Sequence, residues 1–239
     1  MKAKVLTVVL AGLLGACSMP MMQIDASFAQ VAEYYLVTGR QGLMLKQQIR
    51  FADVETSKID RDWNSTTTVE VLGVSSQKRR TGYRFSVLQN GENTARVDCS
   101  SGGDMSQVDV SSVFGKNTSM VLDAVDFLQC SLLKWGETKN WQLDLIQSYD
   151  GKEMRGVLRP AVYSNAPAPY EILGVSEIEG FDWALGEQVG FEVFKQGRQL
   201  MAVQLMGNGA VWLAPDLNAD ERRFMTSLAL AMLAYQKVE

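Results

Sequence analysis

Apolar and polar side chains alternate along much of this chain, with the period of two that is typical of β-strands with one buried face. Leu43, Leu45, Ile49 and Phe51 fall on one face of such a segment, with Met44, Lys46, Gln48 and Arg50 on the other. Similar segments follow at 67–73, 83–88 and 140–147. The pattern predicts about ten strands, most of which pair antiparallel with a neighbour in the chain.

Short turn signals separate these segments. Asn90-Gly91, Asp150-Gly151 and Asn208-Gly209 each join two alternating stretches, and Gln196-Gly197 turns the preceding strand into the third pair. Both central residues of a type I′ turn need a positive φ, which Asn-Gly and Asp-Gly tolerate. We therefore expect β-hairpins at these positions.

Two segments have a helical period instead. In the first, expected at 27–38, Ser27 and Gln30 form a capping-box pattern, and Gly39 is placed to end the helix. In the second, expected at 219–236, Asn218 and Glu221 mark the start, and the residues that follow are apolar on every face. A helix of this kind packs against a sheet or plugs one end of a barrel, or else inserts into a membrane or a partner.

These elements predict a mainly β (α+β) fold: an antiparallel sandwich or partly closed barrel with a short N-terminal helix and an apolar C-terminal helix. We expect one β-rich domain over residues 27–239. Residues 159–171, which hold three of the five prolines, are either an internal boundary or, as we favour, one long connection.

The first residues have the pattern of a secretory signal. Lys2 and Lys4 precede an apolar stretch at 5–16, which is too short to span a bilayer. The sequence Leu14-Gly15-Ala16-Cys17 resembles the lipobox of bacterial lipoproteins. The resemblance implies cleavage after residue 16, a diacylglyceryl (and fatty acyl) group on Cys17, and a lipidated tether at 17–26. Ser18, in place of Asp, points to the periplasmic face of the outer membrane.

The net charge of the chain bears on which partners it could bind. Removing residues 1–16 takes away two lysines and no acid, so the formal net charge moves from −4 to −6. This balance gives no reason to expect nucleic acid as a partner. Lys78-Arg79-Arg80 is interpreted as a solvated turn, with contact to lipid headgroups as the alternative.

The two cysteines other than Cys17 form an expected disulfide. Export places the mature chain in an oxidising compartment, where Cys99 and Cys130 are the remaining thiols. Closing a loop of about 30 residues stabilises a fold by roughly 3–4 kcal/mol. The Ser- and Gly-rich segment 100–119 is expected to be a loop that this crosslink holds; two free buried thiols are the alternative.

Several chemistries are excluded. The chain has no histidine, so it has no Ser-His-Asp or Cys-His triad and no histidine-ligated zinc. We expect neither a cofactor nor a metal; Asp216, Asn218 and Asp220 are interpreted as helix-capping residues. Glu177, Glu179 and Asp182 are the remaining carboxylate cluster that a hydrolase of the glycosidase type could use.

Function is consequently a choice between hypotheses. The leading one is a non-enzymatic envelope lipoprotein, held to the membrane through Cys17, that binds a protein or supports assembly. The alternative is a carrier of a lipid or another hydrophobic ligand in a β-cavity. A carboxylate-based hydrolase around Glu177 and Asp182 is a weaker alternative.

The lipid anchor can be tested by phase partitioning in a detergent that forms a separate phase on warming. We expect the wild-type protein to enter the detergent phase and Cys17→Ser to stay in the aqueous phase, because only the thiol can carry the diacylglyceryl group. If both proteins stay in the aqueous phase, the lipoprotein hypothesis is wrong.

Overall fold

The structure is a computed structural model of the chain. It describes residues 20–40, 47–62, 64–71, 74–109, 119–134, 137, 140–147, 153–161, 168–181 and 188–236. Cys17, the expected turn at Asp150-Gly151 and the carboxylate of Asp182 lie outside these residues.

The described residues form fourteen strands and two helices. The helices are α2 (Ala26–Val31) and α4 (Ala219–Ala234). The strands are β1 (Glu33–Leu36), β2 (Arg50–Phe51), β3 (Val54–Thr56), β4 (Asp60–Arg61), β5 (Ser65–Val71), β6 (Val74–Gln89), β7 (Glu92–Asp109), β8 (Ser119–Lys134), β9 (Asn140–Gln147), β10 (Met154–Pro160), β11 (Tyr170–Val175), β12 (Gly190–Lys195), β13 (Arg198–Gln204) and β14 (Ala210–Leu213).

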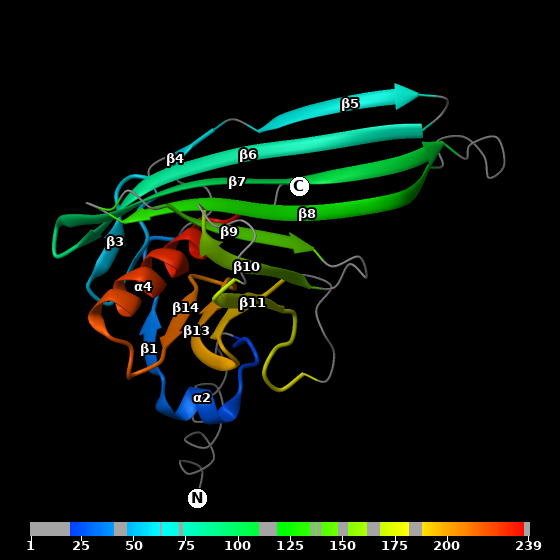
Figure 1. The fold of residues 1–239 in the computed structure, drawn as a ribbon. Helices are drawn as coiled ribbons and strands as arrows, with labels where there is room; N and C mark the ends of the chain where they lie inside the picture. Colours follow the sequence, from blue (N-terminus) through cyan, green and yellow to red (C-terminus); the bar gives the residue numbers. More distant parts are fainter. Residues whose placement is uncertain are drawn as a thin grey trace, which may run out of the picture.

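All these strands belong to one antiparallel sheet that curls into a nearly closed barrel (Figure 1). Its order is β1-β14-β13-β12-β11-β10-β9-β8-β7-β6-β3-β2, with β4 and β5 added on β6. Neighbours along the chain are thus mostly neighbours in the sheet, as the hairpin signals predict. Of the two predicted architectures, sandwich and partly closed barrel, the structure shows the second.

The barrel closes where the first strand in the sheet order meets the last. Thr38, just after β1, and Arg50, in β2, exchange two backbone hydrogen bonds of 2.9 and 3.0 Å. Gly39 lies at this seam with φ +76°, and a Cβ there would come within 1.9 Å of the Gln48 carbonyl oxygen. Gly39 therefore allows the two chain segments to approach, and does not end a helix as predicted.

The C-terminal helix α4 fills the barrel (Figure 1). Every residue from Phe224 to Ala234 is buried, and those from Leu228 to Ala234 have no exposed surface at all. The inward side chains of the strands, among them Leu128, Leu143 and Leu158, are equally inaccessible and belong to the same core. A helix that is apolar all round is expected where every face is covered, and here strands cover it.

The buried end of α4 has a hydrogen-bond partner for each of its last four carbonyl groups, which lack partners within the helix. The Tyr83 hydroxyl donates to Ala231 O at 2.8 Å, and the backbone N–H of Tyr235 donates to Met232 O at 3.1 Å. Arg40 Nε donates to Leu233 O at 2.7 Å, and Arg61 Nη2 donates to Ala234 O at 2.9 Å.

The two guanidinium groups also place positive charge at the negative end of the helix dipole. Burial lowers the pKa of Arg40 and of Arg61. Since the ordinary pKa of arginine lies above 12, both groups stay charged at neutral pH. Arg61 is fixed further by the Gln47 amide oxygen at 2.9 Å and by the Tyr83 ring, whose centroid lies 5.4 Å from its Cζ atom.

The other end of α4 begins as predicted. The Asn218 side-chain oxygen accepts from the N–H groups of Asp220 and Glu221 at 3.0 and 2.9 Å, and its amide donates to Glu221. Arg222 forms two hydrogen bonds to the Glu33 carboxylate, of 2.6 and 2.9 Å, which join the first turn of the helix to β1. The helix predicted at 219–236 is confirmed, and it ends two residues earlier than expected, at Ala234.

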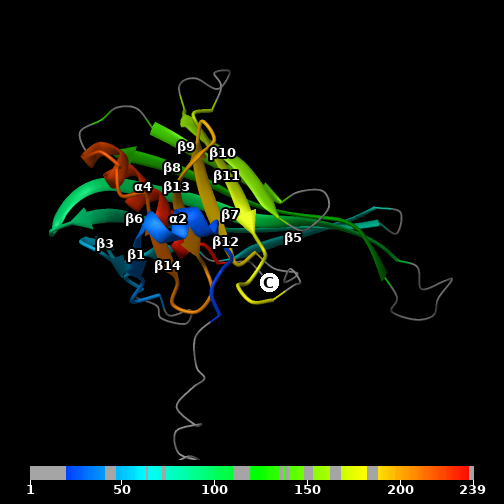
Figure 2. The same ribbon diagram turned by 90° about the horizontal axis from the view of Figure 1, so that it is seen from below.

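Strands β6, β7 and β8 are far longer than the barrel needs, and their outer halves form an arm with β5 (Figures 1 and 2). Residues 100–109 are part of β7, paired with β8 as far as Asp109 and Ser119, so the expected loop at 100–119 is wrong for these residues. Lys78-Arg79-Arg80 lies inside β6 and is not a turn. Residues 110–118 lie outside the described residues.

The disulfide Cys99–Cys130 is present where the arm leaves the barrel. The two residues are direct partners in the β7–β8 register, with their Cα atoms 4.1 Å apart. Tyr83 is the partner of Cys99 on β6. The crosslink therefore joins two strands that the backbone ladder already aligns, next to the tyrosine that binds the end of α4.

The predicted N-terminal helix is half correct. Helix α2 covers Ala26–Val31, capped by Asp25, whose carboxylate accepts from the N–H groups of Ser27 and Phe28 at 2.8 and 3.0 Å. The residues after Ala32 form β1, which pairs with β14. Aromatic and β-branched residues favour a strand once a partner strand is available, and this tertiary contact overrides the helical period.

Two of the three described turns follow their sequence signals. Asn90 and Gly91 have φ of +52° and +82°, and Gln196 and Gly197 have +52° and +78°, as a type I′ turn requires. The predicted turn at Asn208-Gly209 differs, because Gly209 has φ +91° whereas Asn208 has no positive φ, and residues 205–209 form a longer connection between β13 and β14. The strands β10 and β11, on either side of the proline-rich segment at 159–171, pair antiparallel in the same sheet. Among the described residues, none of the helices is long and apolar enough to cross a membrane.

The helix-end bonds predict the effect of removing one hydroxyl group. Tyr83→Phe leaves the Ala231 carbonyl buried without a donor, so we expect the free energy of unfolding to fall by about 1–3 kcal/mol in urea titrations. Tyr34→Phe is the matched control: Tyr34 is 46% exposed, and its change should stay within about 0.5 kcal/mol. Equal decreases in the free energy of unfolding for the two variants would show that the hydrogen bond from Tyr83 to Ala231 does not stabilise the fold.

Candidate functional site

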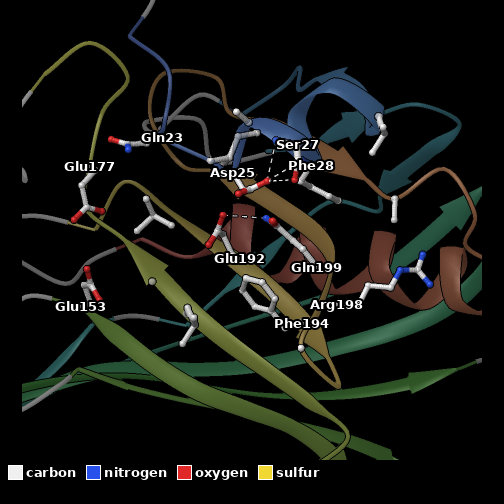
Figure 3. A pocket seen from close by; sticks show the side chains of 18 of the residues that line it. Gln23, Asp25, Ser27, Phe28, Glu153, Glu177, Glu192, Phe194, Arg198 and Gln199 are labelled. Atoms are coloured by element: carbon white, nitrogen blue, oxygen red, sulfur yellow. Dashed lines mark hydrogen bonds between the residues drawn. The ribbon is translucent and has the colours of Figure 1, made fainter.

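A groove of about 1330 Å³ lies on the outer face of the barrel. Its floor is formed by β11, β12 and β13, and α2 with the segment before it forms one wall (Figure 3). Charged and amide side chains surround it, among them Asp25, Glu177, Glu192 and Gln199.

The floor results from the alternation of the strands. Arg155, Leu173 and Glu192 are consecutive register partners on β10, β11 and β12, so their side chains share one face. The intervening residues Ile172 and Val193 are fully buried on the opposite face, against the core. The outer face of these strands therefore presents the polar side chains of Arg155 and Glu192 beside the apolar side chain of Leu173.

The wall depends on the first described residues of the chain. Met21 O accepts from Glu179 N at 2.8 Å and Gln23 N donates to Glu177 O at 3.0 Å, on either side of the bridge between Met22 and Ile178. Met22 is 2% exposed, and its N–H donates to the Gln204 side chain at 2.8 Å. Residues 21–26, within the segment expected as a lipidated tether at 17–26, are consequently docked on the barrel.

A glycine makes room for this docking. A Cβ on Gly190 would lie 1.9 Å from Met22 Sδ and 2.4 Å from the Val203 carbonyl oxygen. The N-terminal segment thus rests on a position in β12 that only glycine can occupy without displacing it.

The groove carries an excess of negative charge. Arg198 pairs with Asp216, and Arg155 Nη2 lies 3.6 Å from the Glu153 carboxylate. The remaining carboxylates, Asp25, Glu177 and Glu192, have no arginine or lysine partner among the described residues. Asp25 instead caps α2, which lowers the pKa of its carboxyl through the hydrogen bonds it accepts from Ser27 and Phe28.

Glu192 differs from Asp25 in the direction of its pKa shift. Burial raises its pKa, and the negative charges of Asp25 and Glu177 raise it further, while the hydrogen bond from Gln199 Nε2 at 2.9 Å acts in the opposite direction. The group therefore retains its proton to a higher pH than an ordinary glutamate, at which its neighbour Asp25 is ionised.

The sequence prediction found part of this cluster. Glu177 lines the groove, whereas Glu179 is exposed and is not among the lining residues, and Asp182 lies outside the described residues. Asp25 and Glu192 were not predicted. The alternation of Phe191, Glu192 and Val193 indicates only that Glu192 faces away from the core, and nothing in the pattern brings it to Asp25.

Chemically, the groove offers three carboxyl groups without an arginine or lysine partner among the described residues, which suits binding of cationic or hydrogen-bond-donating groups. No group of three or more Asp, Glu or Cys side chains within the described ranges could hold a metal ion. The helix-capping interpretation of Asn218 and its neighbour Asp220 agrees with the hydrogen bonds at the start of α4.

Comparisons with protein-family models, with curated proteins and with solved structures find no match to this chain.

The raised pKa of Glu192 predicts a pH-dependent stability difference. The folded state holds the proton more tightly than the unfolded chain, so stability falls as the pH rises from the unfolded pKa through the folded one. Glu192→Gln removes this loss, and we expect it to be more stable than wild type in urea at pH 7.5. At pH 3.5, below the ordinary glutamate value of about 4.3, the difference should vanish.

The control is Glu171→Gln, an exposed carboxylate on the adjacent strand β11. Its stability relative to wild type should be the same at both pH values. A pH-independent gain for Glu192→Gln would assign the effect to packing and contradict the electrostatic account.

Proposed function

We propose that this protein is a lipid-anchored, non-enzymatic component of the bacterial envelope that binds a protein partner. The observation that carries the proposal is that α4 occupies the barrel, with Leu228 to Ala234 fully buried. A carrier of a hydrophobic ligand needs an apolar cavity of about 300–1,000 Å³. Here the space in which a β-barrel would hold such a ligand contains the chain's own helix.

The large outer groove does not suit a lipid either. It is open to solvent, and three of its carboxylates have no cationic side chain as partner within the described ranges. An acyl chain gains its binding energy from apolar surface that becomes buried. The charges of this groove favour a polar or cationic group, such as the side chains of another protein.

The docked N-terminal segment supports a position close to the membrane. If Cys17 carries the lipid, the three residues 18–20, or four Cα–Cα steps, separate it from Met21, which is hydrogen-bonded to the barrel. Four extended steps reach about 14 Å at most. The barrel would then lie against the membrane that anchors it, at the outer membrane if Ser18 directs it there, and a partner would have to reach it at that surface.

Native mass spectrometry of the protein extracted from its own membrane tests the proposal. We expect a stoichiometric complex with a second protein, and the same complex for Cys17→Ser when both partners are mixed in solution, because the anchor places the domain but does not form the interface. A bound lipid in addition to the covalent anchor, with no protein partner, would contradict the proposal and favour the carrier.

A further inference from the structure

The arm ends in a strand with one free side. Strand β5 pairs with β6 along its whole length, from Ser65–Arg80 to Val71–Val74, and no other described strand pairs with it. Every residue from Ser65 to Glu70 is exposed. The backbone N–H and C=O groups on this side are therefore available to another extended chain.

This edge has few of the features by which proteins usually protect a free strand. The β5–β6 register has no bulge, and the sequence Ser-Thr-Thr-Thr-Val-Glu-Val contains neither proline nor lysine. Its one charged side chain, Glu70, is exposed near the far end of the strand, opposite Ser75 in the register. Its threonines and valines favour a strand, and Val69, 54% exposed, offers an apolar contact. Seven residues is also a usual length for a strand.

Positive charge lies next to the edge. Thr66 is the register partner of Arg79 and Thr67 that of Lys78, so the two cations lie on opposite faces of the arm, one strand in from its edge. Arg79 binds only the Gln77 side chain, and within the described part of the chain neither cation has a carboxylate partner. The third cation, Arg80, is already paired with Asp104 at 2.9 Å.

The position of the edge argues against a second copy of the chain. In Figure 1, β5 lies on the side of the molecule opposite to α2. Two β5 edges that pair antiparallel are related by a twofold axis perpendicular to the sheet. Such an axis turns the α2 sides of the two copies in opposite directions, so that two lipid anchors could not enter one membrane.

We propose that β5 binds an extended, acidic segment of a partner protein, which adds to the arm as a fifth antiparallel or parallel strand. The backbone of β5 supplies the hydrogen bonds, and Lys78 and Arg79 select carboxylates on the two faces of the added strand. The proposal rests on the proposed function, since it names the chemistry of the protein partner and the place where it binds.

Synthetic peptides test this without the natural partner. The probes are three capped eight-residue peptides: repeated Thr-Thr-Glu-Glu, which carries carboxylates on both faces of a strand, repeated Thr-Thr-Lys-Lys, and an acidic peptide with Pro in place of Thr, which cannot donate to a strand ladder. Each is titrated into the lipidated protein in detergent micelles, and amide hydrogen exchange is followed. We expect only the Thr/Glu peptide to slow the exchange of residues 65–71.

Charge reversal then tests the selectivity. Lys78→Glu and Arg79→Glu should each weaken the Thr/Glu peptide by roughly two- to fivefold, and the double variant should prefer the Thr/Lys peptide. Lys58→Glu, an exposed lysine outside β5 and β6, is the control and should leave both affinities unchanged.

Three results would overturn the proposal. The first is no protection of residues 65–71 by any peptide, and the second is equal protection by the acidic and basic peptides. The third is protection in the protein alone together with a doubled mass, which would assign the edge to a second copy. Native mass spectrometry tests the proposed function separately. If a protein partner binds equally well to the wild-type protein and to the double variant, the β5 site is refuted but the proposed function is not.

Discussion

A helix that ends inside a barrel leaves four carbonyl groups away from water, and the rest of this structure depends on how they are paired. An unpaired buried carbonyl costs about 1–3 kcal/mol, so four would remove much of the stability of an ordinary domain. Tyr83 and Arg61 come from β6 and β4, and Arg40 comes from the segment after β1. The chain segments that bind the helix end thus lie near the two ends of the sheet order, and the same bonds that cap the helix hold the seam together.

The change from buried to more exposed side chains along the long strands also depends on α4. On β6 the inward residues Tyr83, Phe85 and Val87 are buried where α4 lies beneath them, whereas residues 75–80 are polar and are partly buried or, at Lys78, exposed. The backbone pairing continues without α4 because the strands satisfy one another. The helix therefore determines where the barrel ends and the arm begins, and the Cys99–Cys130 crosslink lies at this boundary.

Much of the fold could be predicted from the sequence because its signals are local. Alternation, Asn90-Gly91 and the Asn218 cap each act over a few residues, and the structure contains them as expected. The prediction failed where a distant partner decides. Residues 33–36 have helical spacing but pair with β14, and residues 100–109 look like a flexible loop but have β6 and β8 on either side. Glu177 could be identified as a candidate, whereas Asp25 and Glu192 meet it only through the docking of Met22 on Gly190.

The order of the elements along the chain gives the filled barrel a further consequence. Helix α4 comes after all fourteen described strands. Synthesis therefore makes β1 to β14 first, and until residues 219–234 arrive these strands have no helix to close around, so their apolar inner faces stay open to other proteins. A chain interrupted before residue 219 would lack the centre of its core rather than one peripheral element. The barrel can close only once α4 has been made.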